Sequence, residues 1–416
     1  MKSFLKSVLL VFTSAVFVFI GVELLLRISK PKGLQYYRDV KLLHAYHPEY
    51  GVTLQKKEAR FIKHYASLWQ GQFTTNSLGI RGTKEADPNS PKLLCLGDSM
   101  VMGFGVSDHE TFCSLLDGIK IGDKVHQSLN LGVDAYGSLG YAKRLEDILQ
   151  QIDKPKEVLV FISPNDFAMP EVLRKQGILP DDELDALHEN DPTWKRNFKL
   201  QFEATRVSYV LQALKLSYEQ SILLSQQTKL AFFEELNQIF FQPDRYLWES
   251  FFLGQVSPKV CRKKENQTTV VCPEPIPVHE FTCIDKAPNE KDLPPLPDLT
   301  KKSYDRLYQL SLEKGFRLHP VFIPVQVEEI YCHLNGKYHP LGNYSLQAKA
   351  YWKTKSVHSI DLTDYTPEMC GTKFEEQSEI KLSKIRDFFI PGDGHLTKLG
   401  NEWVAKSLKT ELGKLK

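Results

Sequence analysis

Residues 92–99 read KLLCLGDS, a short apolar run that ends in a glycine-marked turn. Two similar runs follow, VHQSLNLG at 125–132 and EVLVFIS at 157–163. Short apolar runs bounded by turn residues are typical of buried strands. Between them, 109–119 (HETFCSLLDGI) and 138–152 (SLGYAKRLEDILQQI) have helical spacing. Strand, helix, strand, helix and strand in this order predict right-handed crossovers and a parallel sheet.

The same alternation returns near the end of the chain. It predicts helices at 303–315 and 396–412 and strands at 316–325 and 356–363. Residues 171–300 interrupt it with two predicted helices, 196–217 and 219–241, and a stretch rich in Pro, Lys and Glu. We therefore predict an α/β core built from 91–170 and 301–416, with 171–300 as a helical, cysteine-containing insertion and a candidate cap.

The first residues of the chain are strongly apolar. SVLLVFTSAVFVFIGVELLL at 7–26 contains one charge, Glu23, and about 20 such residues span a bilayer core of roughly 30 Å. A cleaved signal peptide is the alternative, but LLLRISKPK stands where a small-residue cleavage site belongs. We predict a transmembrane anchor at 1–30, followed by an ordered lead-in segment at 31–90.

Cysteines help to place the body relative to the membrane, because basic residues flank the apolar segment on both sides. Five cysteines suit disulfides in an oxidising compartment and do not have zinc-site spacing: Cys261, Cys272, Cys283, Cys332 and Cys370. Cys95 and Cys113 have apolar neighbours, so we expect them to be buried free thiols. We therefore expect the body outside the cytoplasm, in the periplasm or its equivalent.

Charge and motifs exclude some function classes. The chain has 53 Lys and Arg and 51 Asp and Glu, a net charge of +2, so nothing in its charge indicates a nucleic-acid partner. Gly103-Phe104-Gly105 lacks the third glycine of the dinucleotide pattern, and the sequence has no P-loop.

Polar residues follow the predicted strands at the edge where α/β sheets bind ligands. Ser99, on the turn after the first strand, is a candidate nucleophile at a helix N-terminus, where N–H groups and the helix dipole favour negative charge. Asp393 and His395, before the last helix, could supply its orienting acid and its base. Taken alone, the first motif could be a helix N-cap and the second a solvated loop.

Gly132 and Asn165 follow the two neighbouring strands. An acyl transfer develops an oxyanion that needs preorganised N–H donors, which a glycine backbone and an asparagine amide provide. Taken singly, each residue is better explained as an ordinary turn residue. Because all four features lie at strand ends on one edge of one sheet, we expect them to form a common site.

Together these residues resemble the blocks that define the SGNH/GDSL hydrolase superfamily. LLCLGDSMVMGFGV resembles the serine block, LNLGVDAYGSLGYAKRLE the glycine block, VLVFISPNDF the asparagine block and DGHLTKLG the histidine block. The lead-in, with TTNSLGIRG, resembles that of tethered bacterial members. The resemblance implies a three-layer α/β/α, flavodoxin-like fold. It also implies a triad of Ser99, Asp393 and His395 and an oxyanion hole of Ser99, Gly132 and Asn165.

Two positions depart from the family pattern. Ser163 stands where a glycine usually precedes x-Asn-Asp, and Gly392 stands where an aspartate usually precedes the histidine by three residues. Asp393 lies two residues before His395, a D-x-H variant that occurs in related transferase-like members. Asp387 and Asp361 are the alternative orienters.

The resemblance implies a serine hydrolase that removes or transfers O-acyl groups, such as acetyl, without a metal or organic cofactor. The expected partners are an acylated carbohydrate or lipid substrate of the cell envelope and the membrane itself, and no nucleic acid. Two alternatives remain: a non-catalytic binding or assembly protein that keeps the fold, and a structural membrane protein with an unrelated α/β body.

Overall fold

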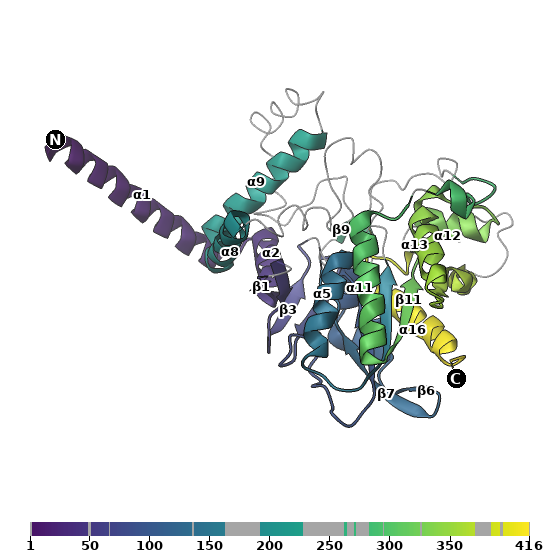
Figure 1. Cartoon of the computed structure of the whole chain (residues 1–416). Helices are drawn as coiled ribbons and strands as arrows, with labels where there is room; N and C mark the ends of the chain where they lie inside the picture. The colour runs from purple at the N-terminus through teal and green to yellow at the C-terminus, as the bar shows by residue number, and fades with distance from the viewer. Residues whose placement is uncertain are drawn as a thin grey trace.

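A six-stranded sheet is at the centre of this computed structural model (Figure 1). Its order is β12-β11-β8-β5-β7-β6, with β12 at Ile360–Asp361, β11 at Arg317–Phe322, β8 at Pro155–Ile162, β5 at Lys92–Leu96, β7 at Lys124–Asn130 and β6 at Ile119–Ile121. The pairs from β12 to β7 are parallel, and β6 is an antiparallel edge strand. In chain order the parallel strands run 2-1-3-4-5, which is the doubly wound arrangement.

The structure describes residues 2–48, 51–65, 67–134, 137–162, 192–227, 262–263, 270–271, 283–293, 295–324, 327–370, 384–391 and 394–415.

Hydrophobic cores lie on both faces of the sheet. Side chains alternate along a strand, so Leu94 and Leu96 of β5 face one core while Leu93 and Cys95 face the other. The first core includes α5 (Ser138–Leu149) and α11 (Asp298–Lys314), which pack side by side (Figure 1). The second includes α4 (Phe112–Leu115) and α16 (Lys398–Leu412). The predicted α/β class with a mostly parallel sheet is therefore confirmed.

The lead-in segment folds onto the sheet domain. It consists of α2 (Lys32–Leu43) and two antiparallel pairs, β1 (His44–His47) with β2 (Gly51–Leu54) and β3 (Ala59–Lys63) with β4 (Gln70–Thr74). Leu43, Leu54, Ile62 and Phe73 are buried in the same core as β5. The ordered lead-in predicted at 31–90 therefore includes a helix that was not predicted, because residues 31–90 are polar and aromatic with no long apolar period.

Two predicted elements are shorter in the structure. The helix expected at 109–119 is a 3₁₀ turn (Asp108–Glu110) followed by α4, and it ends before Gly118, whose φ is +77°. The strand expected at 356–363 is reduced to β12, after which Asp361 caps a 3₁₀ turn at Leu362–Tyr365. In both places short-range turn and capping contacts end the element.

The remaining described elements lie outside the sheet. They are α1 (Lys2–Ser29), α3 (Ser99–Met102), α8 (Pro192–Val207), α9 (Tyr209–Gln227), β9 (Arg262–Lys263), β10 (Val270–Val271), α12 (Val327–Leu334), α13 (Asn343–Thr354), α14 (Pro367–Cys370) and 3₁₀ turns at Glu290–Asp292 and Pro340–Gly342. In α1, Phe4–Ser29 is long and apolar enough to cross a membrane, and its most apolar stretch is unburied. A signal sequence would meet the same criteria.

The structure corrects the prediction of free thiols. Cys95 on β5 and Cys113 on α4 form a disulfide, with their Cα atoms 6.2 Å apart. Their apolar neighbours indicated burial correctly, but burial does not determine whether a second cysteine lies opposite. Cys283 pairs with Cys332, in agreement with the disulfides expected among the later cysteines. Cys261 and Cys272 lie outside the described residues.

Glu329 on α12 is a largely buried carboxyl group. Burial, together with the charge of Asp361, raises its pKa to about 7 against the opposing charge of Lys349. Among the described residues, none donates a hydrogen bond to its Oε2 atom. The ionised form of Glu329 is therefore unfavourable in the folded protein.

We expect Glu329→Gln to stabilise the protein at high pH. The folded pKa is above the unfolded value of 4.5, so the folded state binds the proton more tightly and wild-type stability falls as pH rises from about 4.5 to about 7. The variant should gain on the order of 1–3 kcal/mol at about pH 8 and much less at about pH 4. Thermal unfolding measures this, with Glu328→Gln as the matched control; an equal gain at both pH values would contradict it.

Candidate active site

Ser99 is the first residue of α3, directly beyond the carboxyl end of β5. The Asp98 carboxylate caps this turn by accepting the Met100 N–H at 2.9 Å. Gly103 ends it with a φ of +74° and donates its N–H to the Ser99 carbonyl. Because α3 is a single turn, the helix dipole expected from the sequence is small, and the local N–H groups remain as the source of positive potential.

His395 lies on a tight loop before α16. The Ile390 N–H donates to the His395 carbonyl at 2.7 Å, and the Gly394 N–H donates back to the Ile390 carbonyl at 3.1 Å. Gly394 has a φ of +86°, which favours glycine. The Thr397 side chain caps α16 by accepting the Gly400 N–H. The cap and the loop fix the backbone from which His395 projects.

The structure brings Ser99 and His395 together across 296 residues of sequence. His395 Nε2 lies 2.8 Å from Ser99 Oγ, and both side chains are half-buried. In the tautomer that keeps its proton on Nδ1, Nε2 accepts the serine hydroxyl proton, as a general base must. The Phe104 ring lies 5.3 Å from the imidazole, centroid to centroid, and Trp69 packs behind Phe104 at 5.1 Å. The pair therefore has an apolar wall on one side.

Two predicted site residues lie outside the described residues: Asp393, the expected orienter, and Asn165, the expected oxyanion donor. The alternative orienters are placed elsewhere. Asp361 forms an ion pair with Lys349 and accepts the Thr363 N–H, and the Asp387 side chain is exposed.

Gly132 packs against the turn that begins with Ser99. A Cβ atom at this position would lie 2.2 Å from Met102 N, so no other residue fits without moving α3. The Gly132 N–H donates to its neighbour Asn130 Oδ1 at 3.0 Å, and Asn130 Nδ2 donates to the Val101 carbonyl at 2.7 Å. Gly132 could serve an oxyanion only by exchanging or sharing this hydrogen bond.

His44, which is buried, and Asp134, which is partly exposed, form a pair beside the site. Neither residue was among the predicted site residues. His44 Nε2 contacts Asp134 Oδ1, and His44 Nδ1 lies 2.7 Å from the Val40 carbonyl. Two acceptors on one imidazole require both nitrogens to be protonated, so His44 is a cation here. Burial alone would lower the pKa of His44, but Asp134 outweighs it and raises the pKa.

The Asp134 carboxylate also interacts electrostatically with His395. Burial alone would raise the pKa of Asp134, but His44 and, to a smaller extent, His395 lower it. Asp134 follows Val133, whose N–H donates to the Gly97 carbonyl at 3.2 Å. This backbone hydrogen bond places Asp134 next to the turn that carries Ser99. Its position two residues after Gly132, at a strand end, was the only sequence signal for it.

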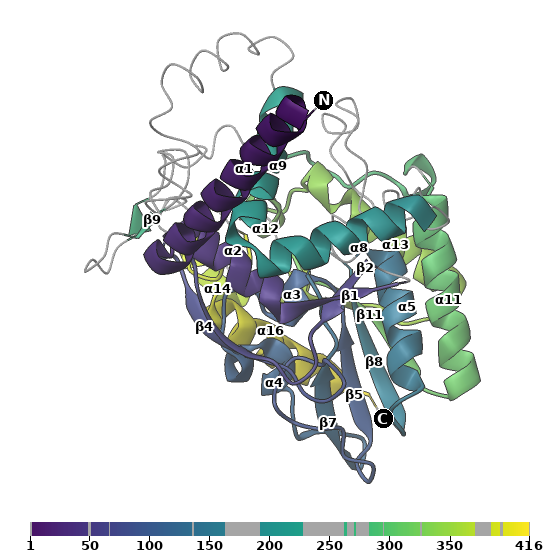
Figure 2. The same cartoon turned by 90° about the vertical axis from the view of Figure 1, so that its left-hand side faces the viewer.

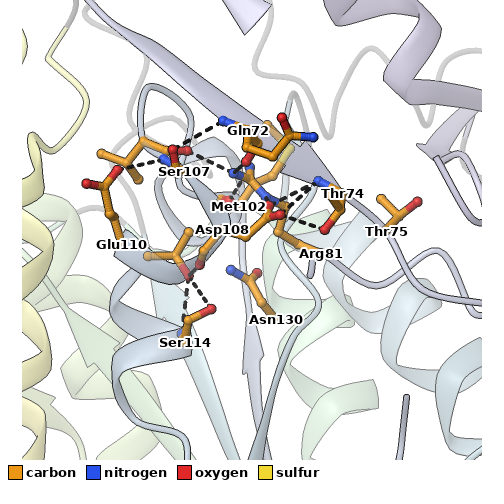
Figure 3. A network of polar contacts seen from close by, with 12 residues as sticks. Gln72, Thr74, Thr75, Arg81, Met102, Ser107, Asp108, Glu110, Ser114 and Asn130 are labelled. Carbon is orange, nitrogen blue, oxygen red and sulfur yellow. Dashed lines mark hydrogen bonds and ion pairs between the residues drawn. The ribbon is translucent and has the colours of Figure 1, made fainter. Parts of the chain in front are cut away.

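Arg81 from the lead-in segment holds the loop that follows Ser99 (Figure 3). Its guanidinium pairs with Asp108 and donates to the carbonyls of Met102 at 3.0 Å and Val106 at 2.8 Å. It also lies over the Phe73 ring, 3.8 Å from the centroid. The side chain is 1% exposed, so the end of the nucleophile turn depends on a charge supplied by the lead-in.

Comparisons with known proteins do not assign this chain to a family. No family model matches this sequence, and no curated protein matches it significantly. Within the described residues, the structure has no group of three or more His, Cys, Asp or Glu side chains that could hold a metal ion.

Proposed function

We propose that this protein is a membrane-anchored serine esterase or O-acyltransferase of the SGNH/GDSL type, with Ser99 as nucleophile and His395 as base. The main support is the 2.8 Å contact between His395 Nε2 and Ser99 Oγ. The contact lies at the carboxyl end of β5, where the strand order reverses. Open α/β sheets bind their ligands at this place.

The proposed reaction begins when His395 takes the Ser99 hydroxyl proton and Oγ bonds to the ester carbonyl carbon. The carbonyl electron pair moves to oxygen, and this oxyanion accepts hydrogen bonds from the Ser99 N–H, the Gly132 N–H and the Asn165 amide. The bond to the alcohol then breaks as His395 returns the proton to it, with Asp393 orienting the imidazole. Water, or a sugar hydroxyl, attacks the acyl-enzyme and releases the acid or a new ester.

The proposed substrate is an O-acylated glycan or lipid-linked saccharide outside the cytoplasm. Two disulfides, Cys95–Cys113 and Cys283–Cys332, support this location because such bonds persist in oxidising compartments. The apolar helix α1 supports attachment to the membrane. Hydrolysis and acyl transfer share every step up to the acyl-enzyme, so they differ only in the acceptor.

A fluorophosphonate probe tests the proposal on the full-length protein in detergent. We expect covalent labelling of the wild type and none of Ser99→Ala or His395→Ala. Adding an oligosaccharide acceptor to a reaction with p-nitrophenyl acetate then separates the two outcomes: acetate is released in hydrolysis, and the acetylated oligosaccharide forms in transfer. A folded wild type that reacts with neither probe would favour the non-catalytic binding protein instead.

The Asp134–His44 pair should adjust the pH dependence of this reaction. His395 must be neutral to act as base, so kcat/KM rises with pH along an acid limb. His44→Gln leaves the Asp134 carboxylate without its counter-charge, which favours protonated His395 and should move this limb to higher pH. Asp134→Asn removes the negative charge and should move it to lower pH, each by up to about 1 unit.

The pH–rate profiles of both variants check this prediction. Lys41, a further charged neighbour of His44, is unchanged in both variants. A pair with a structural role alone would lower the Tm of both variants without displacing the limb. Displacement of both limbs in the same direction would contradict the electrostatic account.

A further inference from the structure

The C-terminal end of α1 forms hydrogen bonds with the adjoining ends of α8 and α9. The Glu23 carboxylate accepts hydrogen bonds from the backbone N–H groups of Tyr209 at 3.0 Å and Val210 at 2.9 Å, and from Ser208 Oγ at 2.8 Å. Arg27 donates to the Val207 carbonyl at 2.8 Å. The anion thus caps the N-terminus of α9 and the cation caps the C-terminus of α8, as the helix dipoles favour.

Apolar and aromatic contacts complete this junction. Leu26 of α1, Leu34 of α2, and Tyr209 and Leu216 of α9 form a separate buried cluster. Arg38 of α2 lies over the Tyr209 ring, 4.2 Å from its centroid. The apolar helix, the lead-in and the two insertion helices are therefore joined where the candidate membrane span ends.

Four large apolar side chains of α8 and α9 are exposed, and together they are called the α8–α9 apolar face. It consists of Leu200, Val207, Leu214 and Tyr218, which are 63%, 65%, 61% and 65% exposed. Leu200 and Val207 are seven residues apart on α8, and Leu214 and Tyr218 are four residues apart on α9, so each pair lies along one side of its own helix. Figure 1 shows α9 running crosswise to α1 from the point where α1 ends. A helix in that position lies along the surface of a bilayer that α1 crosses.

We propose that this α8–α9 apolar face lies in the boundary between headgroups and acyl chains of the bilayer that α1 spans. The last turns of α1, from which Glu23 and Arg27 contact α8 and α9, also carry exposed apolar residues, Leu24, Leu25 and Ile28. Three basic residues, Arg27, Lys30 and Lys32, stand at the C-terminal end of the apolar segment, and such residues match anionic lipid headgroups. The lipid surface is therefore the partner whose chemistry fits both parts.

This contact would fix the height of the candidate active site above the membrane. β1 follows α2 directly, packs beside α8 and supplies His44, which contacts Asp134 next to Ser99. In the view of Figure 2, α3 lies near the centre, between α2 and β1. Ser99 would then face substrates at the membrane surface. The proposal rests on α1 being a membrane anchor, and its test treats the two separately.

The test places an environment-sensitive fluorescent amino acid at single positions of the full-length protein in vesicles of phosphatidylethanolamine and phosphatidylglycerol. Leu214 and Tyr218 report on the apolar face, and Phe12 reports on the span. Leu312 of α11, 61% exposed, is the matched control on the body. Lipids with a nitroxide at a shallow or a deep position quench from inside the bilayer, and iodide quenches from water.

At Leu214 and Tyr218 we expect the shallow nitroxide to quench the fluorescence. Iodide should quench it several-fold less at these two positions than at Leu312. At Phe12 we expect quenching by the deep nitroxide. Iodide quenching equal to that at Leu312, with Phe12 still in the bilayer, overturns the docking of α8–α9 and leaves the anchor intact. Protection from iodide without nitroxide quenching overturns it in favour of a protein partner. A Phe12 signal unaffected by either nitroxide removes the anchor and the docking together.

Discussion

Ser99→Ala is expected to reduce the kcat/KM for p-nitrophenyl acetate by on the order of 10³ to 10⁶-fold. Without Oγ no acyl-enzyme can form, and water would have to attack the ester directly from a site shaped for a fixed nucleophile. Full-length protein in detergent and initial rates give the measurement. Ser90→Ala, on the exposed loop before β5, is the matched control and should keep the wild-type rate.

His395→Ala should cost nearly as much, because base and nucleophile act as a unit. The double variant should be no slower than Ser99→Ala, since groups that act in one step are not additive. An additive loss would mean that His395 acts on something other than Ser99. An unchanged rate in Ser99→Ala, with unchanged thermal stability, would remove the serine from the mechanism altogether.

Arg81→Ala is expected to give the largest loss of stability, on the order of 3–5 kcal/mol. The variant leaves Asp108 without its cation and leaves two buried carbonyls, those of Met102 and Val106, without their donors. The Phe73 ring also loses the guanidinium that covers it. In a chain of this size Tm should fall by on the order of 10 °C.

Thermal unfolding of the full-length protein checks this prediction, and Arg306→Ala is its control. Arg306 also pairs with two carboxylates, Glu146 and Glu313, but its side chain is 37% exposed. Solvent screens such a pair, so we expect a change of about 0–1 kcal/mol. Similar losses in the two variants would show that burial of Arg81 is not what makes its contacts strong. Arg81→Ala should also slow the reaction, because the loop after Ser99 loses its support.

Several features could be predicted because they depend on neighbours in sequence. The run LLCL before Gly97 has the periodicity of a buried strand, and β5 occupies it. The helices near 138–152 and 303–315 follow from regular apolar spacing, and Thr397 caps α16 as its position before that helix indicates. Local patterns also located the turns that hold Ser99 and His395.

Other features escaped because they depend on what lies opposite in space. Apolar neighbours predicted that Cys95 is buried, but only the packing of α4 on β5 brings Cys113 to bonding distance. The His44–Asp134 pair joins residues 90 apart, with no local pattern at either end. The apolar segment itself gives no reason for the charge of Glu23. The folded structure supplies one, because the N-terminal N–H groups of α9 donate to its carboxylate.

The sequence by itself determined the class of the fold, the five parallel strands of the sheet, and the place of Ser99 and Gly132 at its carboxyl edge. These follow from short-range periodicity and turn chemistry, which act within a few residues. The position of Ser99 and His395 at strand ends, together with the family resemblance, also predicted that they meet. Only the tertiary structure decided that Arg81 supports the nucleophile turn and that the end of α1 binds α8 and α9. Such contacts are decided by burial and by the pairing of charges between distant segments, and a sequence pattern does not specify which segments meet.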